Sequence, residues 1–553
     1  MVREVFTFIV GGKAGEGVKK AGAAASRLFV DMGRHIFQAD EYESLIKGGH
    51  NYSAVSTAVR QVTGTYLKAD LLVCLDKRSY DIHQDHLAEG GVLVHNTDVM
   101  GPGRWKGVGL PLTSAAKKFP NPELRMGLGA VAALMAALGL ERSDVMKLVK
   151  EEYSRDLESN LSFALVVHEL AAPQLGGRFR LERGGSKRTM LFGNQAIVLG
   201  AYLGGLDLYF AYPMTPSSSA LHYIAGKAKE LGVTVVQPES EIAVMNMAIG
   251  ATFTGARSMV GTAGGGFGLM VEALSMAGMA EAPVLVLLAS RVGPSTGSAT
   301  LHEQSDIRFA LGAGHGEFPR IVASPGTAKE ALLLAAEMLD LVWKFQVPGI
   351  LLTEKHLCES TMTADIDPAE AAWSEPAVHN DGEYKRYRIT DDGVSPLLFP
   401  PTKQLDKWSS HMCDELGLVS EDAGVITQMH DKFRRKGETI AEKLKTMHTV
   451  NSFGNDGPLI MTYGSTTMAV VEALRFAGMN ARVVQPVYLE PFPEWALGCY
   501  SEERPVVVEQ SSTGMFARLI EEKLGVEARA VVLKYDGRPF DPEELAAQLK
   551  AVV

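Results

Sequence analysis

Two short segments near the middle of the chain hold reactive side chains on rigid local backbone. In Tyr212–Ser218 (YPMTPSS), two prolines remove backbone donors and fix φ, so the hydroxyl of Thr215 lies on a stiff turn. In Gln237–Ala243 (QPESEIA), Ser240 can cap a helix and place Glu241 in its first turn. Each has a structural alternative: a tight turn with Ser217 capping the next helix, and a surface carboxylate favoured by the helix dipole.

Two further segments supply a glycine-rich turn and an arginine. Gly261–Met270 (GTAGGGFGLM) has five glycines, which indicate close backbone approach to a ligand or a neighbouring subunit. Its spacing matches neither a P-loop nor the dinucleotide fingerprint. Arg291 directly follows an apolar strand, at the edge where ligands of open α/β sheets bind, and its planar donors suit a carboxylate. A structural salt bridge is the alternative for Arg291.

The elements that must position these segments alternate strand with helix from Met190 to about Thr353. Such alternation predicts a parallel sheet covered by helices. The predicted strands are Leu208–Ala211, Thr234–Gln237, Ser258–Gly261, Val284–Ala289 and Gly349–Leu352.

The amino-terminal part shows the same alternation, from Met1 to about Arg183. A strand at Val5–Val10 leads into the glycine-rich turn Gly11–Gly17 and then a helix of small residues at Lys20–Met32. The turn could cradle phosphates, and Lys47-Gly48-Gly49-His50 could face an anionic ligand. A purely structural turn is the alternative, and His50 alone fits a satisfied interface histidine better than a catalytic base. Later elements are predicted at Ala69–Leu75, Gly91–His95 and Gly127–Leu140.

The rest of the chain contains linkers and a third alternating segment. Arg178–Arg188 is charged and predicts a linker, and Glu359–Lys403 has too few apolar runs for a packed core. A helix near Asp422–Thr446 carries the basic cluster Lys432–Lys436. Strands are then predicted at Leu459–Thr462, Arg482–Pro486, Pro505–Glu509 and Ala530–Lys534, with helices at Thr467–Ala477 and Met515–Leu524.

Composition excludes several classes of protein. The net charge of −11 argues against a nucleic-acid-binding surface, which needs a basic patch. Apolar stretches are too short for a membrane span, and the amino terminus lacks the apolar core of a signal peptide, so we expect a cytoplasmic protein. The four cysteines lie more than fifty residues apart, which argues against an iron–sulfur or zinc site in this chain.

In combination, these segments resemble a known family. GNQAIVLGAYLGGLDLYFAYPMTPSS, PESEIAVMNMAIGATFTGARSMVGTAGGGFGLM and SRVGPSTG resemble the pyrimidine-binding domain of 2-oxoacid:ferredoxin oxidoreductases. GGKAGEGV and SLIKGGHNYS resemble that family's gamma subunit. EPFPEW, VVVEQSSTG and KYDGRPF resemble its transketolase C-terminal-like domain. The order, gamma ahead of alpha, is most similar to that of the 2-oxoglutarate-type enzymes.

The resemblance implies three α/β domains with mostly parallel sheets. A gamma-type domain would span residues 1–183, a thiamine diphosphate pyrimidine-binding domain residues 189–358, and a transketolase C-terminal-like domain residues 454–553. Residues 359–453 would form a connector that contains the basic helix. That helix would be either a ferredoxin docking site or, as we favour, a subunit contact or solvated face.

The resemblance also assigns roles to single residues. Glu241 matches the family's cofactor-activating glutamate, which needs a desolvated carboxyl that can share a proton with the pyrimidine ring. Thr215 and Arg291 match its substrate-binding threonine and arginine, whose donors suit the carboxylate and carbonyl of a 2-oxoacid. Further cofactor contacts are expected from Tyr212, Pro213, Gly264 and Gly265. Coenzyme A contacts are expected from Gly12, Gly15, Lys47 and Gly48.

The missing parts of such a site are assigned to a beta subunit. No Gly-Asp-Gly motif for binding metal and diphosphate occurs in the sequence. The beta subunit would hold Mg²⁺ with the diphosphate and a 4Fe-4S cluster, in a dimer of heterodimers that is active only as a complex. The expected reaction is oxidative decarboxylation of 2-oxoglutarate to succinyl-CoA with reduction of ferredoxin, or its reverse. Pyruvate, branched-chain or aryl 2-oxoacids are alternative substrates, and a non-catalytic α/β scaffold is an alternative of another class.

Overall fold

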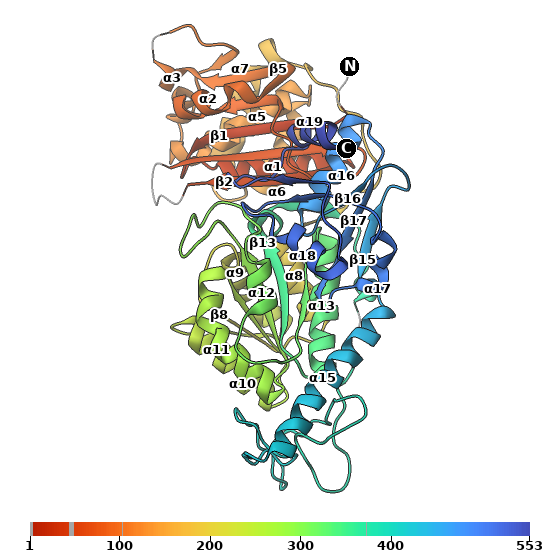
Figure 1. The fold of residues 1–553 in the computed structure, drawn as a ribbon. Helices are drawn as coiled ribbons and strands as arrows, with labels where there is room; N and C mark the ends of the chain where they lie inside the picture. Colours follow the sequence, from red (N-terminus) through yellow and green to blue (C-terminus); the bar gives the residue numbers. More distant parts are fainter. Residues whose placement is uncertain (1–3, 44–48, 102, 372) are drawn as a thin grey trace. The chain divides into compact units, whose positions relative to one another are not determined.

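Three β-sheets organise the chain in the computed structural model, which describes residues 4–43, 49–101, 103–371 and 373–553 (Figure 1). The predicted α/β class is confirmed. The first of two units consists of Met1–Leu191 with Ser360–Asp365 and Phe540–Leu545. The second unit consists of Phe192–Glu359, Ile366–Pro539 and Ala546–Val553.

The sheet of the first unit has the strand order β6-β5-β4-β1-β3-β2-β14-β7. β1, β4, β5 and β6 pair in parallel, whereas β1, β3, β2 and β14 pair antiparallel, so this sheet is only half parallel. Its strands are β1 (Phe6–Lys13), β2 (His35–Tyr42), β3 (His50–Ala58), β4 (Ala69–Cys74), β5 (Leu87–Asn96), β6 (Val108–Leu110), β7 (Thr189–Phe192) and β14 (Thr361–Ala364).

Helices of the first unit bury an apolar core against this sheet. Every residue of α5 is buried, because this helix is apolar on all sides and packs against α1 and α7. The helices are α1 (Val18–Asp31), α2 (Lys77–His83), α3 (Thr97–Met100), α4 (Leu112–Ala116), α5 (Met126–Ala137), α6 (Arg142–Glu152) and α7 (Leu157–Leu175).

Two local predictions for the first unit were wrong. The first strand does not end at Val10 but continues through Gly11 and Gly12 to Lys13, because these residues pair in register with β3. The connector expected from residue 359 onward does not begin as irregular chain. Its first residues form β14, which pairs with β2 in the first sheet.

The central sheet of the second unit has the order β18-β12-β13-β11-β10-β8-β9. All pairs from β12 to β9 are parallel, and β18 is antiparallel to β12. The five predicted strands are present, and the short strand β12 was missed. The strands are β8 (Leu208–Ala211), β9 (Thr234–Val236), β10 (Ser258–Thr262), β11 (Val284–Ser290), β12 (Ile321–Ala323), β13 (Gly349–Glu354) and β18 (Tyr488–Glu490).

Helices surround the central sheet, as a parallel α/β arrangement requires, because each crossover returns the chain along a face of the sheet (Figure 1). Those of the central part are α8 (Gly193–Leu203), α9 (Ser218–Leu231), α10 (Glu241–Phe253), α11 (Gly264–Ala280), α12 (Ile307–Gly312), α13 (Ala328–Phe345) and α14 (Lys355–Glu359).

A five-stranded C-terminal sheet completes the second unit, in the order β15-β17-β16-β19-β20. The strands are parallel except for β15, which pairs antiparallel with β17. The strands are β15 (Val450–Phe453), β16 (Leu459–Met461), β17 (Arg482–Pro486), β19 (Val506–Glu509) and β20 (Ala530–Leu533). The helices are α15 (Ala423–Lys445), α16 (Thr466–Ala477), α17 (Glu494–Leu497), α18 (Met515–Leu524) and α19 (Pro542–Val552).

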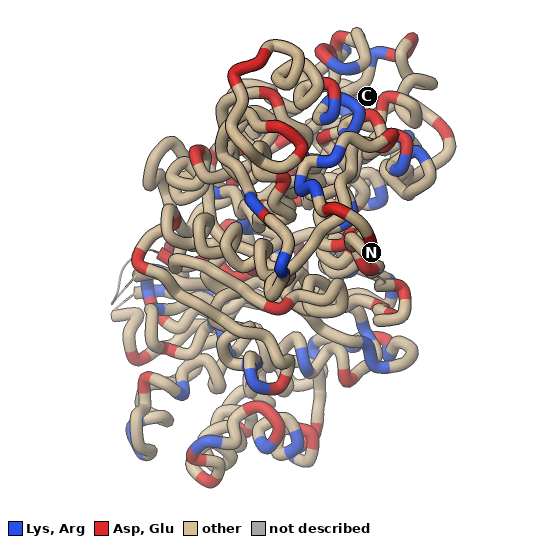
Figure 2. The backbone as a smooth tube through the Cα atoms, turned by 90° about the horizontal axis from the view of Figure 1, so that it is seen from below, with Lys and Arg blue, Asp and Glu red and all other residues tan. Residues whose placement is uncertain are grey.

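Charged residues of both signs occur throughout the chain. Lys and Arg are interspersed with Asp and Glu along the backbone (Figure 2). Within the described ranges, no helix has both the length and the apolar content needed to cross a bilayer.

Candidate active site

The predicted site segments follow the carboxyl ends of four neighbouring parallel strands. Thr215 follows β8, Glu241 follows β9, Gly264 follows β10 and Arg291 follows β11. In the sheet these strands lie in the order β9-β8-β10-β11, all parallel, so the four segments share one edge. This is the edge at which open parallel sheets bind their ligands.

Glu241 is a buried carboxylate at the first position of α10. The N-terminus of the helix is capped as predicted, since the Oγ of Ser240 accepts the N–H of Ala243 at 3.4 Å. The Glu241 side chain is only 4% exposed, and its Oε1 has no hydrogen-bond partner among the described residues. Leaving a buried polar atom unsatisfied costs about 1–3 kcal/mol, so Glu241 presents an acceptor for a donor that the described residues do not supply.

Gly266 makes room for this carboxylate. A Cβ at Gly266 would lie 2.5 Å from Oε1 of Glu241 and would also collide with Oγ1 of Thr262, so only glycine fits. The sequence prediction named Gly264 and Gly265 and missed Gly266. A Cβ at Gly264 would instead lie 2.9 Å from the carboxylate of Asp306, and Gly265 is exposed. The sequence offered one indication of this: Gly266 is adjacent to the apolar Phe267, and both lie on the buried face of α11.

Thr215 and Arg291, far apart in the sequence, are in contact. Nη1 of Arg291 donates to the backbone carbonyl of Thr215 at 2.6 Å. The guanidinium is partly buried, and burial lowers the pKa of Arg291 while the charge of Asp306 opposes this shift. A guanidinium has five N–H donors and stays charged near neutrality, so it can bind a ligand carboxylate as well as this carbonyl.

The turn before α9 does not have the side-chain cap by Ser217 that the structural alternative predicts. Ser217 occupies the capping position, but its side chain makes no cap; its Oγ donates to the carbonyl of Met214 at 2.8 Å. This bond closes the turn on itself. Tyr212 is 39% exposed and Pro213 is also exposed, so both lie at the surface of the sheet edge.

Asp306 is a site residue that sequence analysis missed. It lies beside Gly264 at the start of α11, and burial raises the pKa of its carboxyl, whereas the charge of Arg291 lowers it. The sequence indicates it only through its position: Asp306 is the acidic residue directly before the apolar helix α12. Asp306 therefore links the glycine-rich turn electrostatically to Arg291.

An exposed apolar surface lies on the helices that carry this site. Three large side chains on α10 and α11 are about half exposed: Ile242 (54%), Met247 (45%) and Leu269 (51%). The two helices pack against each other, and a Cβ placed at Gly250 or Gly268 would meet no other described residue within 4 Å. Large exposed apolar side chains are typical of surfaces that bind other proteins.

The amino-terminal glycine-rich turn contains a carboxylate of its own. Glu16 Oε2 accepts the N–H of Lys13 at 2.7 Å, and a Cβ at Gly12 would lie 2.6 Å from this oxygen. Burial raises the pKa of Glu16. Gly15 has a φ of +99°, and a Cβ placed there would meet no described atom within 4 Å. The other two predicted coenzyme A residues, Lys47 and Gly48, lie outside the described residues.

His50 is a buried, hydrogen-bonded histidine. Its Nε2 lies 2.8 Å from Nε2 of His83, and its Nδ1 lies 3.4 Å from Oγ of Ser79. His83 in turn contacts His86, Nδ1 to Nδ1, at 3.2 Å. Burial lowers the pKa of both His50 and His83, the latter to about 3, so both rings are neutral near pH 7. The structure thus gives His50 partners within its own domain.

The basic cluster of α15, predicted as a ferredoxin docking site, a subunit contact or a solvated face, is divided between buried and exposed cations. Lys432 and Lys436 are fully buried and bind the carboxylate of Glu281, Lys436 at 2.9 Å. The exposed Arg434 pairs with Glu438 on its own helix at 2.9 Å. Two of the cations therefore hold α15 against the end of α11 and are not available to a partner protein.

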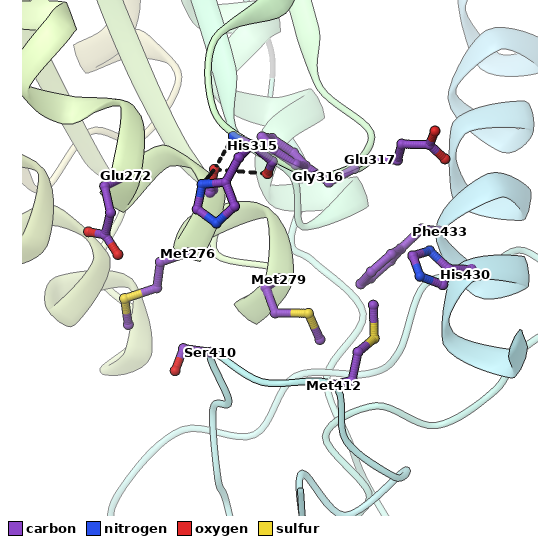
Figure 3. A pocket seen from close by; sticks show the side chains of 12 residues that line it. Glu272, Met276, Met279, His315, Gly316, Glu317, Ser410, Met412, His430 and Phe433 are labelled. Carbon is purple, nitrogen blue, oxygen red and sulfur yellow. Dashed lines mark hydrogen bonds between the residues drawn. The ribbon is translucent and has the colours of Figure 1, made fainter. Parts of the chain in front are cut away.

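A separate pocket of about 260 Å³ lies between α11, α15 and the connector (Figure 3). Ser275 on its wall donates to the carbonyl of His315 at 3.0 Å. None of the predicted site residues lines it, which is expected if the site at the sheet edge is closed only by another chain. The labelled lining residues are Glu272, Met276, Met279, His315, Gly316, Glu317, Ser410, Met412, His430 and Phe433.

The carboxylate of Glu241 fits the pyrimidine half of a cofactor site. Among the described residues, no group of three or more His, Cys, Asp or Glu side chains could hold a metal ion. Three of the four cysteines are buried and all four are unpaired. The unpartnered oxygen of Glu241 beside Gly266 is, in contrast, suited to a ring nitrogen of a bound heterocycle.

Two family models match the chain. The model for pyruvate flavodoxin/ferredoxin oxidoreductase, thiamine diphosphate-binding, matches residues 199–448, and the model for pyruvate ferredoxin/flavodoxin oxidoreductase matches residues 7–169.

Known proteins are similar over most or nearly all of the chain. A 2-oxoacid:ferredoxin oxidoreductase subunit alpha from Sulfolobus sp is 29% identical over 99% of this chain and 97% of its own length. A 2-oxoglutarate synthase subunit KorA from Archaeoglobus fulgidus is 28% identical over 64% of this chain and 96% of its own length. The solved 2-oxoglutarate:ferredoxin oxidoreductase from Magnetococcus marinus, with 2-oxoglutarate, coenzyme A and succinyl-CoA bound, is 26% identical, with a TM-score of 0.91 over 99% of both chains.

Proposed function

Because this chain belongs to the 2-oxoacid:ferredoxin oxidoreductases, which depend on thiamine diphosphate, we propose that it is the large subunit of a coenzyme A-acylating enzyme for 2-oxoglutarate. The reaction is oxidative decarboxylation to succinyl-CoA with reduction of ferredoxin, or the reverse. The choice of 2-oxoglutarate is supported by the names of two similar proteins, one of which was solved with this acid bound.

The observation that carries the proposal is the unpartnered, buried carboxylate oxygen of Glu241 beside Gly266. Thiamine diphosphate, when bound, supplies the carbanion chemistry of decarboxylation. Glu241 holds a proton at the pyrimidine ring, since a carboxyl group removed from water and lacking a protein partner can share that proton with a ring nitrogen. Gly264 and Gly265 belong to the same turn and would contact the cofactor there. Tyr212 and Pro213 would contact it from the neighbouring turn at the sheet edge.

Thr215 and Arg291 orient the substrate. Their contact at 2.6 Å places a hydroxyl-bearing residue and a guanidinium side by side at the edge that carries Glu241. The guanidinium binds the C1 carboxylate of the 2-oxoacid and the hydroxyl donates to its C2 carbonyl, since both are suitable donors for these oxygens. Orientation of this kind would present the C2 carbonyl carbon of the 2-oxoacid to the cofactor and fix the direction of the C1–C2 bond.

A beta subunit completes the site. It would hold the diphosphate and Mg²⁺ through a Gly-Asp-Gly motif and carry a 4Fe-4S cluster that passes electrons to ferredoxin. The exposed apolar side chains Ile242, Met247 and Leu269 lie on α10 and α11, the helices that begin at Glu241 and Gly264, and support a surface covered by this partner. The assembly would be a cytoplasmic dimer of heterodimers, and this chain would be inactive alone.

Coenzyme A is proposed to approach the amino-terminal glycine-rich turn. Gly15 supports a contact there, because a Cβ placed on it would meet no described atom within 4 Å and a ligand could approach its backbone. At Gly12 the carboxylate of Glu16 occupies the approach side and would repel a phosphate unless it is protonated. Burial raises the pKa of Glu16.

The test is a comparison of 2-oxoacids on the complex of this chain with its small partner subunit. We expect coenzyme A-dependent reduction of ferredoxin or a viologen dye, with kcat/KM highest for 2-oxoglutarate. A higher kcat/KM for pyruvate, a branched-chain or an aryl 2-oxoacid would show that this other acid is the substrate, while the proposed reaction type would stand. A complex without 2-oxoacid-dependent reduction would overturn the proposal and favour a scaffold role.

A further inference from the structure

Gln304 is a buried residue in which every polar atom is bound by the domain of the C-terminal sheet. Its backbone N–H donates to the carbonyl of Gln510 at 2.7 Å, and its own carbonyl accepts the hydroxyl of Tyr463 at 2.9 Å. Its Oε1 accepts from Oγ1 of Thr466 at 2.7 Å and from the N–H of Gln510 at 3.2 Å. Its Nε2 donates to the carbonyl of Tyr463 at 3.1 Å.

The same residue ends a closed loop that begins at Arg291. The loop bends back on itself through the N–H of Ser298, which donates to the carbonyl of Val292 at 3.1 Å. Oε2 of Glu303, the neighbour of Gln304, accepts the N–H of Gly293 at 3.2 Å. Gln304 thus lies at the foot of the loop, and Arg291 starts its other limb.

A second contact holds the returning limb of the loop to the same domain. The N–H of His302 donates to the carbonyl of Gly537 at 3.0 Å. A Cβ at Gly537 would lie 2.9 Å from Cδ1 of Leu301, so the loop packs directly on this backbone. The limb from Leu301 to Gln304 is therefore attached to the C-terminal domain at both ends.

We propose that Gln304 is a positioning residue for Arg291: through it, the C-terminal domain sets where the substrate-binding guanidinium lies. This inference rests on the proposed role of Arg291 in binding the 2-oxoacid carboxylate. A side chain held by several hydrogen bonds resists rotation, and a buried amide of this kind tolerates neither loss of its donor nor loss of its acceptor. The C-terminal domain thereby acts on substrate affinity without contacting the substrate.

The experiment compares Gln304→Met with the wild-type complex in a background with and without Arg291→Ala. Met has similar length but no hydrogen-bonding amide, so all contacts of the side-chain amide are lost. We expect KM for the 2-oxoacid to rise about ten- to hundredfold, because displacement of an orienting group by about 1 Å has effects of this size. The KM for coenzyme A should stay within about twofold. In the Arg291→Ala background, Gln304→Met should change KM less than about twofold, since the two residues act as one unit.

The matched control is Gln485→Met, the same substitution in a second buried amide of the second unit. Gln485 Nε2 donates to Glu330 at 3.2 Å, and Asn451 donates to Gln485 Oε1 at 3.2 Å, so this variant also breaks polar contacts made by the C-terminal sheet. It should lower the melting temperature but leave KM for the 2-oxoacid unchanged. If Gln304→Met does not fold, Thr466→Val removes a single bond to Gln304 and should raise the same KM less strongly.

The outcomes separate the two claims. If Arg291→Ala leaves KM for the 2-oxoacid unchanged, the proposed role of Arg291 fails. If Arg291→Ala raises KM but Gln304→Met has no effect, or raises KM equally in both backgrounds, the positioning role is overturned while the proposed function stands. An equal rise of KM in Gln485→Met would assign the effect to general loosening and also overturn it.

Discussion

The two glycine-rich turns of this chain look alike in sequence and differ in what their glycines face. In the turn of the first unit, Gly12 lies against the carboxylate of Glu16, which is bound by the N–H of Lys13 at 2.7 Å. In the turn of the central sheet, Gly266 lies against the carboxylate of Glu241, whose Oε1 has no partner in the described parts of the chain.

In the first turn the carboxylate is hydrogen-bonded within the turn, whereas in the second turn a carboxylate oxygen is left for a ligand to bind. Glu241 is buried and Glu16 is partly buried, and a Cβ at the neighbouring glycine would collide with either carboxylate. A buried polar atom without a partner is retained against its energetic cost only where something else, such as a ligand, supplies the missing bond. The state of the carboxylate, and not the number of glycines, therefore distinguishes the candidate active site.

The largest expected effect comes from replacing the unpartnered carboxylate. Glu241→Gln should lower kcat of the reconstituted complex about 10²–10⁴-fold, because an amide cannot exchange the proton that acid–base catalysis requires. The matched change Glu16→Gln should leave kcat within about twofold, since the amide oxygen of Gln can still accept the N–H of Lys13. Steady-state dye reduction with saturating 2-oxoacid and coenzyme A measures both.

The comparison would break if the two variants behaved alike. Wild-type kcat in Glu241→Gln would remove Glu241 from the chemistry and favour a scaffold role for this chain. A large loss of kcat in Glu16→Gln at saturating coenzyme A would instead show that the first turn acts in the chemical steps and not only in the proposed binding of coenzyme A.

A second pair of variants fills the glycine positions. Gly266→Ala would force its Cβ against Oε1 of Glu241 and should lower kcat about 10²-fold, because the displaced carboxyl no longer meets its ligand. Gly12→Ala would meet Oε2 of Glu16 in the same way, at 2.6 Å. There we expect a loss of about 1–3 kcal/mol in the free energy of unfolding, as for other overpacked sites, with kcat at saturating coenzyme A little changed.

These variants are read by activity and by thermal unfolding of the same preparations. If Gly266→Ala and Gly12→Ala lost the same stability and both retained their activity, the assignment of Gly266 to the active site would be contradicted.

The smallest expected effect concerns a third carboxylate beside a glycine. Glu354 is fully buried next to Gly464 and accepts the N–H of Ser465 at 3.2 Å. Burial raises the pKa of Glu354 from 4.5 to about 7, although its hydrogen bonds oppose this shift. Below about pH 4.5 both the folded and unfolded states hold the proton. As pH rises toward 7 only the unfolded state releases it, so the free energy of unfolding falls.

The expected fall is about 2–3 kcal/mol between about pH 4.5 and 7. The variant Glu354→Gln cannot ionise and should lose this part of the pH dependence. Urea unfolding of the wild type and the variant at several pH values across this window measures the difference. Parallel curves for the two proteins would show that Glu354 does not titrate in this range.

Local pattern was enough to predict the α/β class and most strands of the second unit. Strands β8 and β17 have the predicted bounds, and the cap at Ser240 places Glu241 in the first turn of α10 as expected. These features depend on residues close in sequence: alternating apolar runs, a capping side chain and the turn residues between them. The segments of the candidate site could therefore be located from the sequence.

Tertiary contacts decided what these segments do to one another. Helical phase and packing selected Gly266, rather than Gly264 or Gly265, to face Glu241. The inward direction of Lys432 and Lys436 depended on Glu281, about 150 residues earlier in the chain. The bonds of Gln304 likewise join residues more than 150 positions apart.

The sequence by itself thus determined which elements form and which reactive groups stand at the ends of the strands. Only the tertiary structure decided which of those groups are partnered, because partners distant in the sequence are chosen by packing and leave no periodic signal. For this protein, that decision is what sets the carboxylate of Glu241 apart from that of Glu16.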